Sequence, residues 1–215
     1  MSTATMDTFV WQARHPHDAP ARPKHSFEEK LNRPTRQFVS VDLDKTVHWD
    51  PRALHSLLAA ERLNFDSSLL SAKRMVDVQG DPNYVAYKTE VARWMLEVCA
   101  EEGTDFNVLP LAVSYLNRVL AVQRVPAANL QGLAAACVFV ASKMKAPLPI
   151  VARRLSEYTD GFNWEMAILN LMQWNLSLQT AFEFFDQLLV RAPALEAIRT
   201  SFCSLAYNIQ IGGLR

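Results

Sequence analysis

Hydrophobic side chains recur every three or four residues from about residue 50 onward, the spacing of an α-helix with one buried face. Asp50 followed by Pro51 predicts a helix start, and we expect a short amphipathic helix that ends at Asn64. A second start at Asp81 precedes a longer helix, which Gly103 closes. The buried stripe of this second helix consists of Tyr84, Tyr87, Val91, Trp94, Met95 and Val98.

The stretch from about 127 to 145 follows a different pattern. Residues 132–141, GLAAACVFVA, are apolar on every side and mostly small, so a helix here has no polar face to expose to water. This composition predicts a central helix that other helices surround. Further helices are expected at 150–157, 164–173, 180–190 and 193–207, and no alternating strand pattern is visible. The predicted fold class is therefore all-α.

Residues 1–48 have the composition of a flexible tail, with four prolines, mixed charges and no sustained hydrophobic period. His15 and His17 lie in this tail without a cluster of other ligands, so we expect no metal site there. The N-terminus lacks the apolar core of a secretory signal, and the run 132–141 is much shorter than the roughly 20 residues that span a bilayer. We expect a soluble intracellular protein without membrane contact.

The charge balance and the cysteines narrow the class further. Twenty-two basic and 22 acidic residues give a formal net charge of zero, which argues against a nucleic-acid partner. Cys99, Cys137 and Cys203 are far apart in the sequence, as expected for reduced thiols in the cytosol or nucleus.

No catalytic constellation stands out. All five histidines lie at or before position 55, outside the main helical region. Glu101 and Glu102 are neighbours on a helix and point apart, so they do not form an acid/base pair and are interpreted as a solvated helix end. Cys99 has no histidine nearby in the sequence and is interpreted as a buried structural thiol. We therefore expect neither catalysis nor a cofactor.

Several strings occur together in a recognisable order. They are RWMLEVCAEE (93–102), PLAVSYLNRVL (110–120), LQGLAAACVFVASKMK (130–145), YTD (158–160) and QWNL (173–176). In this order and spacing the chain resembles the cyclin box, most closely that of the D-type (G1) cyclins. The resemblance implies a five-helix bundle around a buried central helix, with an N-terminal helix before it. It divides the chain into a tail at 1–48, a cyclin box at 49–177 and a partial second repeat at 178–215.

The resemblance also implies where a partner would bind. The family's lysine and glutamate that contact the kinase backbone match Lys143 and Glu165. The alternative is a lysine whose chain extends from the end of a buried helix and an acidic residue in a favourable first turn. The apolar part of the implied kinase interface, in which each side chain could equally belong to the core, carries over to Val140, Met144, Leu169, Trp174 and Leu176.

A second implied site is a substrate-docking patch on the first helix of the box. Its pattern falls on Tyr87, Val91 and Trp94, with Glu97 and Gln131 as its polar rim. Glu90 stands where the family has an aliphatic side chain. A carboxylate inside an apolar groove would be costly to bury, so we expect docking of the usual basic-hydrophobic peptides to be weakened.

Two further departures from the family affect the expected function. Between YTD and Glu165 the chain is shorter by about seven residues, or two helical turns, which could displace Glu165. The sequence has room for only one or two helices of the second repeat, so its apolar residues either pack on the first repeat or stay exposed; they are Phe182, Phe184, Phe185 and Leu188.

The expected function is that of a regulatory subunit, present in nucleus and cytoplasm, that binds and activates a cyclin-dependent serine/threonine kinase at the G1/S transition. The alternative is a truncated interaction module that binds a kinase or another partner without full activation. Kinase substrates or inhibitors are expected to bind only through the weakened docking patch.

Overall fold

The computed structural model describes residues 44–159 and 164–212, with the backbone course alone for residues 64–73. All regular elements are helices, and none of the described residues forms a strand, in agreement with the predicted all-α class. In chain order the elements are α2 (Lys45–Trp49), α3 (Pro51–Gln79), α4 (Tyr84–Glu101), α5 (Val108–Val122), η1 (Ala127–Asn129), α6 (Leu130–Lys145), α7 (Ala152–Leu155), α8 (Glu165–Leu171), α9 (Ala181–Arg191), η2 (Pro193–Ile198) and α10 (Arg199–Gly212).

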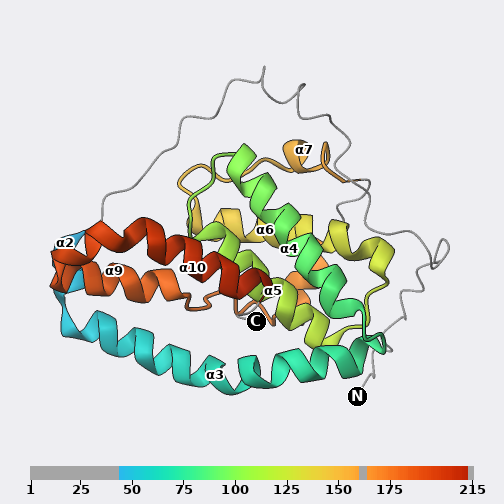
Figure 1. Cartoon of the computed structure of the whole chain (residues 1–215), viewed down its shortest axis with the longest axis horizontal. Helices are drawn as coiled ribbons and strands as arrows, with labels where there is room; N and C mark the ends of the chain where they lie inside the picture. The colour runs from blue at the N-terminus through green and yellow to red at the C-terminus, as the bar shows by residue number, and fades with distance from the viewer. Residues whose placement is uncertain (1–43, 160–163, 213–215) are drawn as a thin grey trace, which may run out of the picture.

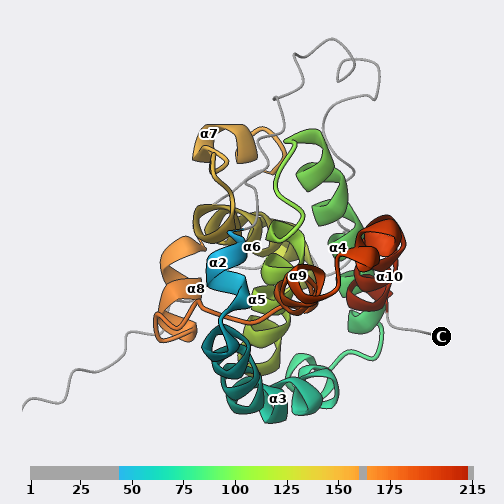
Figure 2. The same ribbon diagram turned by 90° about the vertical axis from the view of Figure 1, so that its left-hand side faces the viewer.

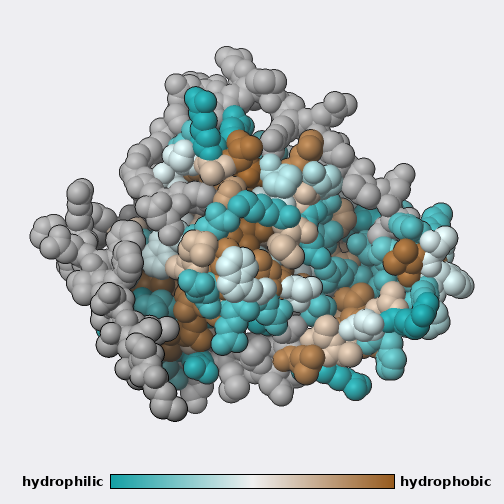
Figure 3. Space-filling view, turned by 180° about the vertical axis from the view of Figure 1, so that it is seen from behind, coloured by the Kyte–Doolittle hydropathy of each residue, from teal (hydrophilic) through white to brown (hydrophobic). Residues whose placement is uncertain are grey.

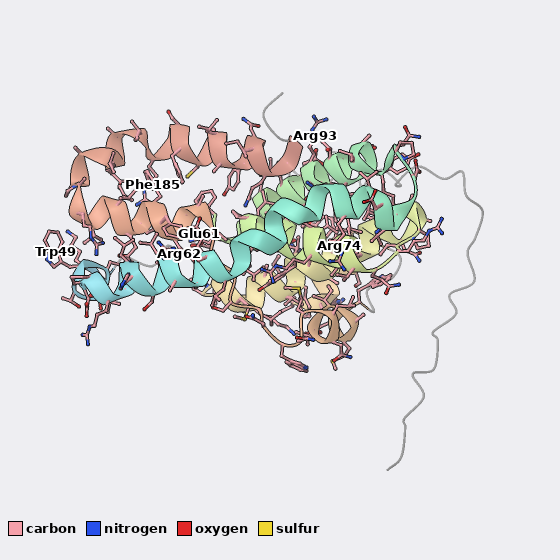
Figure 4. All side chains as sticks on the ribbon, turned by 90° about the horizontal axis from the view of Figure 1, so that it is seen from below. Trp49, Glu61, Arg62, Arg74, Arg93 and Phe185 are labelled. Carbon is pink, nitrogen blue, oxygen red and sulfur yellow. The ribbon has the colours of Figure 1, made fainter. Side chains whose placement is uncertain are left out.

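The long helix α3 corrects the expectation that a first helix ends at Asn64. The helix begins as predicted, with the Asp50 carboxylate accepting the Arg52 N–H at 2.9 Å, but it continues to Gln79 and runs beneath most of the molecule (Figure 4). Asparagine costs only a few tenths of a kcal/mol in a helix interior, roughly as other polar residues do. The effective stop is Gly80, whose φ of 68° ends the helix in the left-handed conformation.

The short helix α2 lies within a segment that was expected to belong to the tail. Residues 45–48 are helical, and the Asp44 carboxylate caps this helix by accepting the Thr46 N–H at 2.9 Å. The boundary at residue 48 was therefore placed too late. The rest of the expected tail, with His15 and His17, lies outside the described residues.

The predicted central helix is α6, which packs against α4, α5 and α8 (Figure 1). Every residue from Gly132 to Ser142 is buried, because a helix without a polar face must be surrounded by protein. By length and composition, Ala127–Lys145 could cross a membrane, but more than half of this stretch is buried inside the bundle. Its hydrophobic character is therefore that of a core helix.

The C-terminal helices pack onto the first bundle through an aromatic cluster. The Phe182 ring lies 5.6 Å from that of Phe106 and 5.3 Å from that of Tyr207, and the Tyr207 hydroxyl donates to the Phe106 carbonyl at 2.9 Å. Phe182 and Phe185 are buried, whereas Phe184 is half-buried and Leu188 is 48% exposed. Phe182 therefore packs on the first repeat, as one alternative predicted, whereas Leu188 stays largely exposed, as the other did.

The single helix expected at 193–207 is two elements. A 3₁₀ segment, η2, follows Pro193, and α10 begins only at Arg199. The change of geometry lets α10 run beside α9 and reach α4 and α5 (Figure 1). Seen from the end, α8 and α10 lie on opposite sides of the bundle, with α5 and α6 between them (Figure 2).

Candidate protein-interaction site

The last turn of α6 and the first residue of α8 meet in an ion pair at the surface. Lys143 Nζ lies 2.6 Å from Glu165 Oε1, and the two side chains are 45% and 35% exposed. The ammonium group also lies 4.0 Å from the centre of the Phe139 ring, one helical turn earlier. The structure thus brings together the two charged residues that were predicted to bind a kinase.

This ion pair leaves most of its hydrogen-bonding capacity open. Within the described part of the chain, the side chain of neither Lys143 nor Glu165 makes a second hydrogen bond. An ammonium group carries three donors, and a carboxylate accepts up to about four bonds. Because an exposed pair contributes only about 0–1 kcal/mol to folding, its contribution to stability is small. The two groups can therefore offer donors and acceptors side by side to the backbone of another protein.

A second pair fixes the same end of α6 to the C-terminal helices. Lys145 forms an ion pair with Glu183 on α9. The other carboxylate oxygen of Glu183 accepts the Thr180 N–H at 3.1 Å at the start of α9. Two lysines in one helical turn therefore pair with different helices, Lys143 with α8 and Lys145 with α9. Both lie at the C-terminal end of α6, which the helix dipole makes negative.

The five apolar residues of the predicted interface divide between core and surface. Val140 and Leu169 are buried, at 3% and 8% exposure, so the core alternative describes them in this structure. Leu176 is half-buried, and its carbonyl accepts the Tyr115 hydroxyl at 2.6 Å. Met144 and Trp174, by contrast, are 46% and 64% exposed. These two side chains are the ones that a partner can cover.

Trp174 lies in a tight turn that ends α8. Its φ is 60°, and the φ of Gln173 is 50°, two consecutive non-glycine residues in the left-handed region. The Trp174 N–H donates to the Leu169 carbonyl at 2.9 Å, which closes the helix. A left-handed residue costs about 1–2 kcal/mol when it is not glycine. The turn therefore contains two strained residues, and it leaves the Trp174 indole exposed to solvent.

A buried carboxylate contradicts the expected solvated helix end at Glu101–Glu102. The Glu102 side chain is 0% exposed and receives hydrogen bonds from Arg154 Nε at 3.1 Å and from the Tyr158 hydroxyl at 2.9 Å. Burial, reinforced by the bond to Glu102, raises the pKa of Tyr158, and the bond to Glu102 raises the pKa of Arg154. Glu102 therefore ties the end of α4 to α7 and the segment after it.

No metal chemistry emerges from the described residues, among which no three His, Cys, Asp or Glu side chains gather at one point. Cys99 and Cys137 are buried free thiols, and Cys203 is a partly buried one. Burial raises the pKa of the Cys99 thiol to about 12, which keeps it protonated and unreactive. The interpretation of Cys99 as a structural thiol is consistent with this environment.

Comparison with known proteins identifies the family of this chain. The family described as "Cyclin, N-terminal domain" matches residues 56–177, more than half of the chain. The chain belongs to the cyclin family. Cyclins are non-catalytic regulatory subunits of protein kinases, in agreement with the predicted absence of an active site.

The similar relatives include D-type cyclins. The chain is 35% identical to the G1/S-specific cyclin-D2 of Gallus gallus over 157 residues, which cover 70% of this chain and 52% of that protein. It is 42% identical to the G1/S-specific cyclin-D1 of Canis lupus familiaris over 113 residues, 49% of this chain and 38% of that protein. The chain thus spans about half the length of the curated relatives that it matches.

A solved structure supports the fold. The X-ray structure of a viral cyclin from herpesvirus saimiri matches with a TM-score of 0.51 and 28% identity, over 60% of this chain and 64% of that one. The prediction of a cyclin fold around a buried central helix is therefore confirmed.

The predicted docking patch of this cyclin has little open apolar surface. Val91 and Trp94 are 1% and 8% exposed, and Tyr87 is half-buried. Gln131 is partly buried and donates to the Tyr158 carbonyl at 3.4 Å, whereas Glu97 is exposed. Glu90 is also exposed, so its carboxylate is hydrated in the free chain, and the predicted cost of burying it under a docked peptide stays a prediction. The patch stays a prediction, with a smaller surface than expected.

Exposed apolar residues near the ion pair were missed from the sequence. Leu148 and Val151, which follow the last turn of α6, and Met166, next to Glu165, are 52–57% exposed. The face behind Figure 1, on which α8 lies, shows hydrophobic side chains among polar ones (Figure 3). The signal available in the sequence was the segment APLPIV, where prolines flank an apolar residue and leave no periodic face to bury it.

Proposed function

We propose that this cyclin binds a cyclin-dependent serine/threonine kinase through the surface around Lys143 and Glu165, and that it activates the kinase at the G1/S transition. The observation that carries the proposal is the exposed ion pair between α6 and α8, with unused donors and acceptors. Met144, next to Lys143 in the sequence, and Trp174, in the turn after α8, are also exposed. Polar groups that meet a partner's backbone and flanking aromatic or methionine side chains are the usual components of a protein interface.

Activation would work by a shift of population. A kinase needs its Lys–Glu ion pair in place for phosphoryl transfer, and this depends on the position of its mobile C-helix. A cyclin that binds the inward position more tightly than the outward one stabilises the active arrangement. The kinase performs all the chemistry, and the cyclin contributes differential binding.

The first experiment measures binding of the full chain to a kinase of the class that D-type cyclins bind. Lys143→Glu should weaken binding by at least about 30-fold, because interfacial charge pairs lose about 2–5 kcal/mol when one partner is changed. Lys145→Glu is the matched control on the same helical turn, since Lys145 pairs with Glu183 of α9. Equal losses in the two variants, with both folded, would refute a specific role of Lys143.

A charge exchange separates contact from packing. The double variant Lys143→Glu with Glu165→Lys restores an ion pair between α6 and α8 but reverses the groups offered to the kinase. If the pair only holds the two helices together, the exchange should restore binding. If the groups contact the kinase, binding should remain lost, which is the result that we expect.

A second candidate function is an interaction module that binds a kinase without full activation. The observation in its favour is that Val140 and Leu169, two residues of the predicted kinase interface, are buried and leave less apolar surface for a kinase. Phosphorylation of a histone or retinoblastoma substrate by the purified complex distinguishes the two: binding without a rise in kinase activity supports the module.

We further propose a nuclear and cytoplasmic location, which imaging of the tagged full chain tests.

A further inference from the structure

The Lys143 ammonium group lies between two groups that come from different helices. Glu165 Oε1 of α8 is 2.6 Å from Nζ, and the centre of the Phe139 ring, on α6, is 4.0 Å from it. A cation within about 6 Å of a ring centre is attracted by the negative face of the ring. The Lys143 side chain is 45% exposed, so another protein can still reach the ammonium group.

The position of the Phe139 ring follows from the geometry and the burial of α6. Side chains on an α-helix tilt toward its N-terminus, so a residue lies over the one four positions earlier, as Lys143 does over Phe139. Phe139 is 6% exposed and belongs to the central helix, in which every residue from Gly132 to Ser142 is buried. Close packing fixes the ring, whereas the lysine chain above it has several rotatable bonds. The ring is therefore the stationary partner of the two.

Lys145, in the same helical turn, is held in another way. The residue four positions before it is Ala141, which has no ring. Its partner Glu183 is itself fixed, because the other carboxylate oxygen accepts a backbone N–H at the start of α9. The Glu165 side chain makes no second hydrogen bond in the described part of the chain, and an exposed ion pair restricts two flexible side chains only weakly. The ring is thus the rigid group that can hold the Lys143 ammonium in place.

We propose that Phe139 is a positioning residue for Lys143: its ring holds the ammonium group in the place where the kinase backbone meets it. The inference rests on the proposed role of Lys143 in kinase binding. Binding must remove the rotational freedom of a lysine side chain, and a ring that already restricts this freedom lowers the cost. The attraction also becomes stronger when the kinase excludes water from the site. Phe139 therefore increases the affinity for the kinase through the lysine that lies over it.

The first arm of the test changes the charge of the ring face and nearly keeps its size. Phenylalanines that carry one, two and three ring fluorines replace Phe139 in the full chain, and each fluorine withdraws electron density from the ring face. The affinity for a kinase of the class that D-type cyclins bind should fall with each fluorine, by about three- to tenfold in total. A phenylalanine that only fills the core would give the same affinity throughout the series, and that result would overturn the proposal.

The matched control is the same fluorine series at Phe182. This ring is also buried, at 1% exposure, and within the described residues no cation lies over it. Fluorination at Phe182 should therefore leave the affinity for the kinase unchanged. Equal losses at Phe139 and Phe182 would show that fluorine acts through packing or stability, and would refute the role of the Phe139 ring face.

The second arm needs no kinase and so separates this inference from the proposed function. In NMR spectra of the free full chain, the ε-methylene protons of Lys143 should be shifted upfield of those of Lys145, because they lie over the face of an aromatic ring. Phe139→Leu should remove this difference, and equal shifts of the two lysines in the wild-type chain would refute the positioning role whether or not the variant folds. If the wild-type chain does not bind the kinase, the proposed function fails, while the NMR comparison still decides whether Phe139 holds Lys143.

Discussion

Gln79, the last residue of α3, should contribute more to stability than any surface glutamine. Its side chain is 3% exposed and makes three hydrogen bonds to the end of α5 and the segment after it. Its Nε2 donates to the carbonyls of Leu120 and Gln123 at 2.8 and 2.7 Å, and its Oε1 accepts the Val125 N–H at 2.9 Å. One side chain thus satisfies three backbone groups that helices leave open at their ends.

The magnitude follows from these three bonds. Gln79→Met keeps nearly the same volume and removes all three, at about 1 kcal/mol each, so the free energy of unfolding should fall by about 3 kcal/mol. For a domain of this size, about 1 kcal/mol shifts Tm by about 2–4 °C, so Tm should fall by about 6–12 °C. Denaturant unfolding of the full chain, monitored by circular dichroism, measures the change.

The matched control is Gln123→Met, which removes an exposed amide with a single side-chain hydrogen bond, 3.3 Å from Nε2 to the Arg124 carbonyl. It should change Tm by no more than about 2 °C, as most surface substitutions do. Similar losses in the two variants would show that the buried bonds of Gln79 contribute little, and would refute the reasoning.

Three further outcomes follow from the structure. Phe182→Ala should lower the free energy of unfolding by about 3–5 kcal/mol in a denaturant titration, because it empties the centre of the cluster that joins α9 and α10 to the bundle. Gln173→Gly should raise Tm by up to about 4 °C, because glycine relieves a φ of 50° at an exposed position; a lower Tm would contradict this strain. With iodoacetamide at neutral pH, Cys203 should be alkylated first and Cys99 and Cys137 only after unfolding, which mass spectrometry measures. Burial raises the pKa of all three thiols, but only Cys99 and Cys137 are buried, whereas Cys203 is partly exposed to the reagent.

The helical pattern was predictable wherever periodicity and caps agreed. The stripe of α4 and the all-apolar sequence of α6 predicted one amphipathic helix and one central helix, and both are present. Asn64 misled because a residue with weak helix propensity is no stop signal by itself, whereas Gly80 combines the sequence signal with the required φ. The 3₁₀ segment after Pro193 was missed because its short period resembles the start of an α-helix.

The site was predictable only where residues far apart in sequence were linked by resemblance. Lys143 and Glu165 are separated by 22 positions, and nothing in periodicity alone brings them together. The burial of Glu102 was unpredictable for the same reason, since its partner Arg154 is 52 positions away. A doublet of glutamates at a helix end gives no sign of which one is buried. Propensity describes neighbours along the chain, but a buried charge depends on a partner that the fold supplies.

Glu102 and Glu165 show how one residue type takes different roles in this cyclin. Glu102 is completely buried and fully engaged, so its hydrogen bonds hold α4, α7 and Tyr158 in one arrangement. Glu165 is about a third exposed and makes one bond, so it can bind a second protein without first breaking a buried network.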